Sequence, residues 1–439
     1  MKKLILFSFI LLSFASCSKD EPENFTSSLQ LHIRYADADY QKGLIGAPVS
    51  VRLTNLLNGA RIEGEYPLGE ILIEDLVAGS YDIEVSSSFT KEEFRELTNQ
   101  ELASESITFN ASAKNVSAQQ DTPYELELVA GRSGGFVIKQ IYYAGSDRID
   151  GAIFRDQFLE IYNNTDEVLY ADSLYFGRLW GAVDPNESRH HLQQNGQFDW
   201  SKSKDMQDTQ GANSNYVYAR DLFMIPGTGK EHPVQPGESI IIAQNALNHR
   251  VPFTGNNGKE VSVRKPELTV DLSGADFETY FGDIPGTSPL ASDVDNAGVR
   301  NVEILVYQGR DWILDNLGRD SYFIFNGKDR AAVDELKDYY APSLAEPNNN
   351  ASRYRQIPSD WILDGVEVQP NVAEDQIPKK LDANIDAGYI HVTEGSYSSQ
   401  SVIRKTAGMS NGRNVLQDSN NSSEDFTVIV ADPRGFANQ

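Results

Sequence analysis

Histidine is the side chain in this sequence best suited to bind a metal or move a proton, but the six histidines form no zinc motif. They are His32, His190, His191, His232, His249 and His391. No two are spaced as ligands on one helix face, and the only cysteine, Cys17, leaves no second thiolate. Adjacent side chains on an extended chain point to opposite sides, so His190 and His191 seldom bind one ion. The pair is predicted to lie in a solvated loop.

Aromatic side chains accompany these histidines in a long polar segment. An exposed ring there can stack on a sugar or another planar ligand, whereas a buried ring would fix the loop to its own domain. Both alternatives are open from the sequence. The candidate ligand-binding residues are Trp180, His190, His191, Trp200, Tyr216 and Tyr218.

Calcium is the one metal that the sequence leaves open, because Asp-rich and Asn-rich loops supply the oxygen ligands that it prefers. The segment 293–298 begins like the loop of a calcium-binding hand. Ala297 occupies the place of a third ligand, and Ile304 stands where the bidentate glutamate belongs. The motif therefore fails, and a structural calcium is the only cofactor considered.

Arg404 is the residue that we single out for a structural role. A planar guanidinium can pair with carboxylates inside a β-sandwich, and Asp418 and Asp425 follow closely in the chain. We predict that Arg404 pairs with these aspartates, and that lysine in its place lowers the melting temperature.

The segment Gly131 to Gly135 formally matches the nucleophile elbow of hydrolases, with Ser133 at its centre. That chemistry needs a turn from a strand into a helix, whereas the residues after Ser133 are typical of a strand. The glycines are instead predicted to form a hinge between domains. No catalytic residue is predicted.

The N-terminus has the three parts of an export signal: Lys2 and Lys3, an apolar run, and small residues before Cys17. The position of Cys17 resembles that of the acylated thiol in bacterial lipoproteins. We predict a signal peptide at residues 1–16 and a lipidated flexible tether at 17–28. The acidic stretch after Cys17 resembles the one that directs Bacteroidota lipoproteins to the outer face of the outer membrane.

The formal net charge of −26 disfavours one class of partner. Nonspecific nucleic-acid binding depends on basic patches that release counterions. No nucleic-acid partner is therefore predicted.

Two antiparallel β-sandwich domains are predicted, so the fold is mainly β. Residues 29–131 contain short strands bounded by turn residues, such as the alternating segment 29–35. Their order resembles the prealbumin or carboxypeptidase-regulatory sandwich, in which such a domain is a spacer or a partner-contact module.

Residues 132–439 resemble a lamin-tail-like immunoglobulin fold. The segments 158–163, 235–243, 364–368 and 401–405 and the acidic ending 418–426 carry the resemblance. The chain is far longer than such a fold needs, and the excess lies in polar excursions at about 180–235, 247–300 and 340–360. Long loops of this kind often bind ligands. A helix is expected at 331–340.

Together these features resemble a Bacteroidota family of surface lipoproteins of unknown function. The resemblance implies a non-catalytic outer-membrane lipoprotein that binds a ligand or partner, as an accessory to an uptake receptor. The alternative is a secreted hydrolase that cleaves glycans or phosphoesters through loop carboxylates. A pair of carboxylates about 5 to 9 Å apart in a cleft would favour this alternative.

Overall fold

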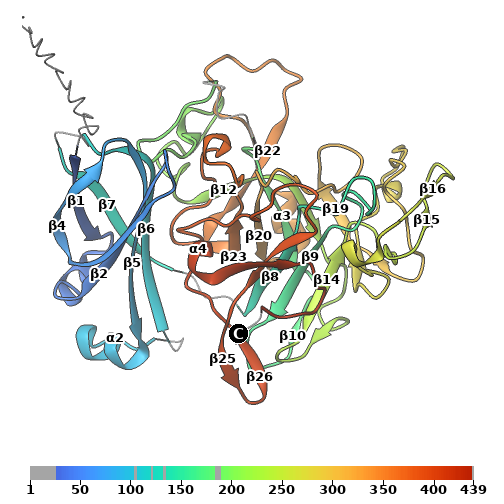
Figure 1. Ribbon diagram of the computed structural model, residues 1–439, viewed down its shortest axis with the longest axis horizontal. Helices are drawn as coiled ribbons and strands as arrows, with labels where there is room; N and C mark the ends of the chain where they lie inside the picture. The colour runs from blue at the N-terminus through green and yellow to red at the C-terminus, as the bar shows by residue number, and fades with distance from the viewer. Residues whose placement is uncertain (1–25, 103–105, 120–121, 132–134, 183–188, 438–439) are drawn as a thin grey trace, which may run out of the picture.

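Strands dominate the structure, a computed structural model that describes residues 26–102, 106–119, 122–131, 135–182 and 189–437 (Figure 1). The predicted signal peptide, Cys17 and Ser133 lie outside the described residues. Among the residues that are described, no helix is both long and apolar enough to cross a membrane.

The N-terminal domain is a seven-stranded sheet folded around its own core. In space the strands follow the order β3-β2-β5-β6-β7-β1-β4. Their bounds are Thr26–Tyr35 (β1), Pro48–Asn55 (β2), Arg61–Pro67 (β3), Gly69–Val77 (β4), Ser80–Thr90 (β5), Ser106–Ser117 (β6) and Tyr124–Ala130 (β7). Two helices join them, Ala38–Gly43 (α1) and Lys91–Thr98 (α2). The strand β1 begins within the segment 17–28 that was predicted to be a tether, because Thr26 already pairs with Val77 of β4.

Alternating burial explains why these segments form strands. In β2, Val49, Val51 and Leu53 are buried while the residues between them are more exposed. β1 runs parallel to β7, so the domain is not purely antiparallel as predicted. The helix α2 begins at a capping box between Thr90 and Glu93, which satisfies its free backbone N–H groups.

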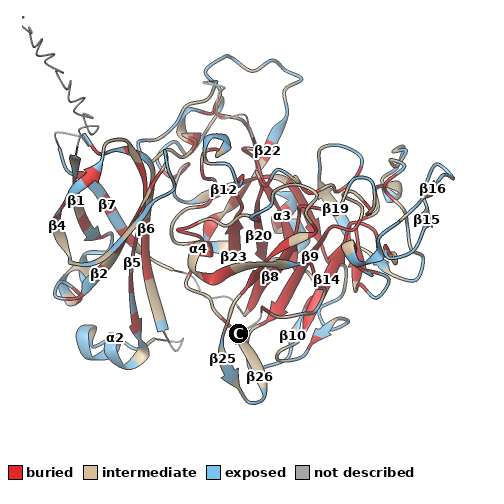
Figure 2. Ribbon diagram, in the orientation of Figure 1, coloured by how far each residue is buried: buried red, intermediate tan, exposed pale blue. Residues whose placement is uncertain are grey.

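The second domain is a β-sandwich of two larger sheets. The first has the order β18-β17-β14-β9-β8-β24-β27. Its strands are Phe136–Tyr142 (β8), Phe158–Asn163 (β9), Ser239–Ala243 (β14), Phe277–Glu278 (β17), Arg300–Asn301 (β18), Gln400–Arg404 (β24) and Phe426–Val430 (β27). The short strands β17 and β18 pair in parallel. Every residue of β8, β9 and β14 is buried, as Figure 2 shows.

The second sheet has the order β21-β22-β12-β11-β20-β23, and β19 pairs with β12. Its strands are Tyr175–Leu179 (β11), Tyr216–Met224 (β12), Glu303–Val306 (β19), Ser321–Phe325 (β20), Asp338–Tyr340 (β21), Arg353–Pro358 (β22) and Ile362–Glu367 (β23). The strands β12 and β22 lie in segments that were predicted to be polar excursions. The predicted helix at 331–340 is also wrong in part, because α3 (Arg330–Asp334) is followed by β21.

Short elements complete the domain. They are the strands Leu169–Tyr170 (β10), Pro233–Val234 (β13), Phe253–Thr254 (β15), Glu260–Val261 (β16), Thr406–Ser410 (β25) and Arg413–Leu416 (β26), the helix Ser422–Asp425 (α4), and the 3-10 turns Trp200–Lys202, Pro266–Leu268, Phe281–Asp283, Ser359–Trp361 and Ala373–Asp375. The hairpin β25–β26 projects from the body of the domain (Figure 1).

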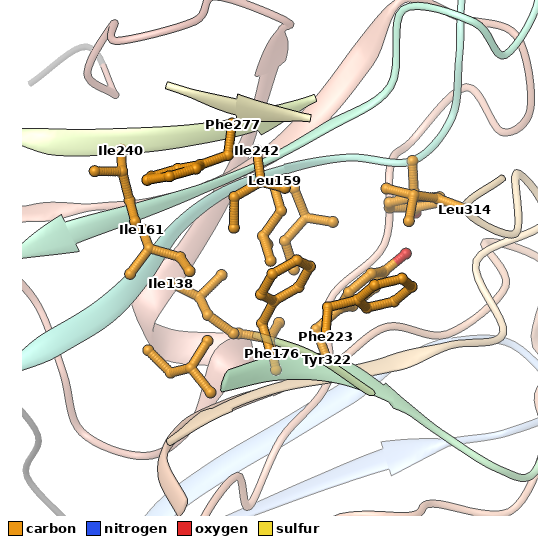
Figure 3. Close-up of a cluster of buried hydrophobic side chains, with 14 of the residues drawn as sticks. Ile138, Leu159, Ile161, Phe176, Phe223, Ile240, Ile242, Phe277, Leu314 and Tyr322 are labelled. Carbon is orange, nitrogen blue, oxygen red and sulfur yellow. The ribbon is translucent and has the colours of Figure 1, made fainter. Parts of the chain in front are cut away.

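The core of the second domain lies between its two sheets. Ile138, Leu159 and Ile242 from the first sheet pack in one cluster with Phe176 and Phe223 from the second (Figure 3). All five side chains are fully buried. The mainly β class and the sandwich architecture are therefore confirmed, whereas the lamin-tail resemblance stays a prediction.

The two domains meet through polar contacts. The Glu84 carboxylate accepts hydrogen bonds from Ser423 Oγ at 3.0 Å and from Asn421 Nδ2 at 3.2 Å. Gly131 lies at this junction, and a Cβ there would come within 2.4 Å of Asn420 Oδ1. A side chain at residue 131 would therefore require Asn420 to move, and the predicted hinge stays a prediction.

Candidate functional site

A cleft of about 600 Å³ opens at one end of the second sheet. Ligand sites are commonly concave, largely aromatic and of this size. Its aromatic lining consists of Phe154, Trp180, Tyr354 and Tyr397. Trp180 follows β11, Tyr354 belongs to β22, and the other two come from loops before β9 and β24. Four separate segments therefore meet at the cleft.

The polar lining consists of Arg220, Gln308, Asp315, Asn316 and Arg319. Arg319 donates two hydrogen bonds to the Asp315 carboxylate, from Nε at 2.8 Å and from Nη2 at 3.0 Å. Such a fork-to-fork pair fixes both side chains. Asp315 is therefore already engaged by a cation.

A β-bulge places Arg220 in this lining. Arg178 pairs with Asp221 and the next residue, Leu179, pairs with Ala219, so Arg220 is the extra residue of β12. A bulge turns the side chain of the extra residue away from its regular direction, and bulges are common beside functional sites. The bulge therefore explains how a residue of a central strand reaches the cleft.

A buried ion-pair network lies behind Arg220. The Arg178 guanidinium donates to Asp221 Oδ2 from Nε at 2.9 Å and to Asp320 Oδ2 from Nη1 at 2.9 Å. Burial alone would lower the pKa of Arg178, but these two carboxylates raise it above its ordinary value. In turn, burial would raise the pKa of Asp320, while Arg178 and Arg220 hold it below its usual range. Arg178 and Asp320 therefore both stay ionised at neutral pH.

Two strained loops form part of the cleft wall. Ile153, next to Phe154, has a φ of 68°, and Tyr397 has a φ of 62°. Positive φ is rare for non-glycine residues and is a clear outlier for a β-branched side chain. The loop after β8 holds both conformations, because Ser146 N donates to Ile153 O at 2.6 Å and Tyr397 N donates to Ala144 O at 2.7 Å. Strain of this kind is concentrated at ligand sites.

The aromatic wall continues into a buried cluster. The Trp180 ring lies 5.2 Å from Tyr354 and 5.4 Å from Trp200, and Trp200 stacks on Tyr218 at 3.6 Å. Tyr218 OH donates to Ala212 O at 2.9 Å, and burial raises its pKa above the ordinary value. The cluster supports the cleft from behind.

Residues 235–432 match the model of DUF4876, a protein family of unknown function. The DUF4876 segment includes Arg319, Tyr354 and Tyr397 of the cleft, whereas Trp180 and Arg220 precede it.

A crystal structure of a DUF4876 family protein from Bacteroides thetaiotaomicron is similar to this chain, with a TM-score of 0.52 and 22% sequence identity. The similarity covers 91% of this chain and 94% of that one, so it extends well beyond the DUF4876 segment on the N-terminal side. At this identity the likeness shows the fold alone. No curated protein matches the chain.

The structure brings most of the predicted ligand-binding residues together, and it buries three of their aromatic rings. Trp180, Trp200 and Tyr218 are all less than 10% exposed, and the Trp180 ring lies 5.1 Å from the His190 ring. Tyr216 packs partly against the same cluster. Trp200 and Tyr218 are buried rings of the kind that fixes the polar segment to its own domain. Of the predicted residues, only Trp180 lines the cleft.

The two adjacent histidines are held by backbone pairing. His190 forms an isolated β-bridge with Ser343, and His191 N donates to Pro342 O at 2.8 Å. In the described part of the chain, no three His, Cys, Asp or Glu side chains come together as a metal site requires.

The DUF4876 segment also contains the residues considered for calcium. Asp293 Oδ2 accepts a hydrogen bond from Phe281 N at 3.0 Å, and Asn296 N donates to Glu278 Oε1 at 2.6 Å. Burial and then the neighbouring Asp311 raise the pKa of Asp293 to about 8. These contacts tie the loop to the preceding segment at Glu278 and Phe281, and structural calcium stays a prediction.

Arg404, also in the DUF4876 segment, meets both predicted aspartates and a third carboxylate that we did not predict. Its Nη2 lies 2.6 Å from Asp364, and its Nη1 lies 3.1 Å from Asp418 and 3.4 Å from Asp425. Nε also donates to Ile138 O at 2.9 Å. Arg404 therefore joins β24, β23 and β8 with the segment before β27.

Proposed function

We propose that this chain is a non-catalytic lipoprotein, anchored to the outer membrane through Cys17, whose cleft binds a ligand. The observation that carries the proposal is the aromatic-lined cleft of about 600 Å³, formed in part by loops with strained backbone at Ile153 and Tyr397. A preformed concave site of this kind suits a small molecule. The N-terminal domain lies between the anchor and this cleft in the chain and would hold it away from the membrane.

The alternative, a hydrolase with paired carboxylates, has less support at this site. Within the described residues, the lining contributes one carboxylate, Asp315, and Arg319 engages both of its oxygens. A two-carboxylate mechanism needs an acid and a second carboxylate on opposite sides of the scissile bond. The composition of the lining therefore favours binding over hydrolysis.

Filling the cleft tests the binding function. We expect Asn316→Trp to abolish the thermal shift that small organic ligands produce in the wild-type chain, because Asn316 lines the cleft and an indole would occupy it. Asn349→Trp, at an exposed position outside the lining, is the matched control and should keep the shift. A ligand that binds the Asn316→Trp chain as well as the wild type would place the binding site elsewhere.

The proposed partner is an outer-membrane uptake receptor. The acidic tether and the lipid anchor predicted from the sequence support this part of the proposal. Crosslinking the lipidated protein in outer membranes and identifying its neighbours by mass spectrometry should recover such a receptor. Recovery of periplasmic proteins alone would contradict both the partner and the surface location.

A further inference from the structure

The charge of the cleft differs from that of the whole molecule. Its lining contains two cations, Arg220 and Arg319, and one carboxylate, Asp315. These lining residues include one more cation than carboxylate, in a chain with a net charge of −26, while the buried Asp320 lies 3.7 Å from Arg220. Clefts lined by one sign of charge concentrate ligands of the other sign.

Arg220 is the cation that is available to a ligand. Its only ion pair in the described residues is at 3.7 Å to Asp320 Oδ1, beyond hydrogen-bond distance. Asp320 is already held by Arg178 at 2.9 Å. The Arg220 side chain is 31% exposed, and its guanidinium donates no hydrogen bond within the described ranges. An arginine that is fixed by a bulge but not hydrogen-bonded has its planar donor fork free for a ligand.

The chemistry of the lining favours a carboxylate over a phosphate. A guanidinium fork matches the two oxygens of a carboxylate. The buried Asp320 carboxylate, 3.7 Å from Arg220, disfavours a ligand of high negative charge. A carboxylate brings one negative charge, whereas a phosphate monoester carries nearly two at neutral pH. The four aromatic side chains then provide the surface for an organic ring.

We propose that the cleft binds a monoanionic ring compound, in which Arg220 pairs with a carboxylate attached to a six-membered ring. The ring packs against the aromatic lining. The side-chain amides of Gln308 and Asn316, which also line the cleft, hydrogen-bond to polar substituents of the ring. This inference rests on the proposed function, because it names the ligand class for the same cleft. Two sources share the chemistry: sugar acids and aromatic acids.

Titration calorimetry on the full chain tests the inference with three probes: glucuronate, glucose and benzoate. We expect at least one of the two acids to bind roughly ten- to a hundredfold more tightly than glucose, as a hydrogen-bonded charge pair provides. Tighter binding of glucuronate would assign a sugar acid, and tighter binding of benzoate would assign an aromatic acid.

Variants then attribute the preference to Arg220. Arg220→Gln should remove the preference for the acid, and Arg220→Lys should retain only part of it, because lysine lacks the fork. Arg330→Gln, at a side chain that is 43% exposed and lies outside the cleft, is the matched control and should bind like the wild type. Circular dichroism and melting curves confirm that each variant folds.

The outcomes separate this inference from the proposed function. If glucose binds as tightly as the acids and Asn316→Trp abolishes its binding, the cleft is a ligand site but the acid preference is overturned. If Arg220→Gln leaves the preference for the acid intact, the role of Arg220 is overturned. If Asn316→Trp weakens the binding of none of the three probes, the proposed function fails as well.

Discussion

Replacing Arg404 with methionine should lower the free energy of unfolding of the second domain by about 3 to 5 kcal/mol, the range observed when one partner of a buried ion pair is removed. Arg404 is 1% exposed and faces Asp364, Asp418 and Asp425. Methionine has a similar length but leaves these carboxylates without a cation. The side chain would also lose the hydrogen bond from Nε to Ile138 O.

The loss should depend on pH. Burial raises the pKa of Asp364 to about 7 and that of Asp425 to about 6, although Arg404 lowers both. Without the guanidinium these pKa values rise further, so the folded state takes up protons that the unfolded state does not hold. The stability of the Arg404→Met chain should therefore fall more steeply than that of the wild type as the pH rises from 5 to 8.

Urea unfolding followed by tryptophan fluorescence measures the effect, because Trp180, Trp200, Trp312 and Trp361 all belong to the second domain. Arg404→Lys should lose about 2 kcal/mol or more, since one ammonium cannot replace a guanidinium that reaches several partners. The control is Arg330→Met, whose exposed ion pairs with Glu303 and Asp334 are worth less than about 1 kcal/mol. A loss for Arg404→Met no larger than that of the control would contradict the structural role.

The strands that could be predicted from the sequence are those whose pattern is local. Val49, Val51 and Leu53 alternate with polar residues, and the apolar run 239–243 belongs to a fully buried strand. In both segments the burial of each side chain follows from its neighbours in the sequence. Arg404 and its two aspartates could be predicted for the same reason, since they lie within about 20 residues of one another.

The strands that were missed owe their place to distant partners. β12 contains Arg220 and Asp221 in its middle, which a local pattern assigns to a polar excursion. The Arg178 guanidinium, from the neighbouring strand, compensates Asp221. Similarly, Tyr339 and Tyr340 were assigned to a helix, but they are buried by pairing with β22. Tertiary pairing overrides local propensity in these segments.

Only the aromatic part of the cleft had a signal in the sequence. Trp180 was among the predicted residues because it lies in a long polar segment, where an exposed ring could stack on a planar ligand. Arg220 reaches the cleft because of a β-bulge. Tyr397 lines the cleft with a positive φ, which a hydrogen bond from its backbone N–H to Ala144 O stabilises. Neither conformation can be predicted from the residue itself, because both are imposed by contacts distant in sequence.

Replacing Asp156 with asparagine should stabilise the protein, and the gain should grow with pH. Asp156 is fully buried, Tyr142 OH donates to its Oδ2 at 3.2 Å, and its Oδ1 has no hydrogen-bond partner in the described structure. Burial raises the pKa of its carboxyl to about 7. A side chain that is neutral at every pH removes the cost of ionising this group inside the protein.

Proton linkage determines how the contribution of Asp156 to stability changes with pH. Between the unfolded pKa of about 3.9 and the folded pKa of about 7, the folded chain keeps a proton that the unfolded chain has lost. The stabilisation from this carboxyl is therefore fully present below about pH 4 and decreases by about 1.4 kcal/mol per pH unit until about pH 7. The total loss amounts to about 4 kcal/mol, an upper bound for the gain from Asp156→Asn at pH 8.

Urea unfolding at pH 5 and pH 8 measures this difference directly. We expect Asp156→Asn to gain about 2 to 4 kcal/mol at pH 8, and about 1.4 kcal/mol less for each unit by which the pH is lowered from about 7 towards 4. Asp360→Asn, at an exposed aspartate, is the matched control, and its effect should be small and equal at both pH values. If the two variants show the same pH dependence, Asp156 ionises in the folded protein as it does in solvent, and its burial is without energetic consequence.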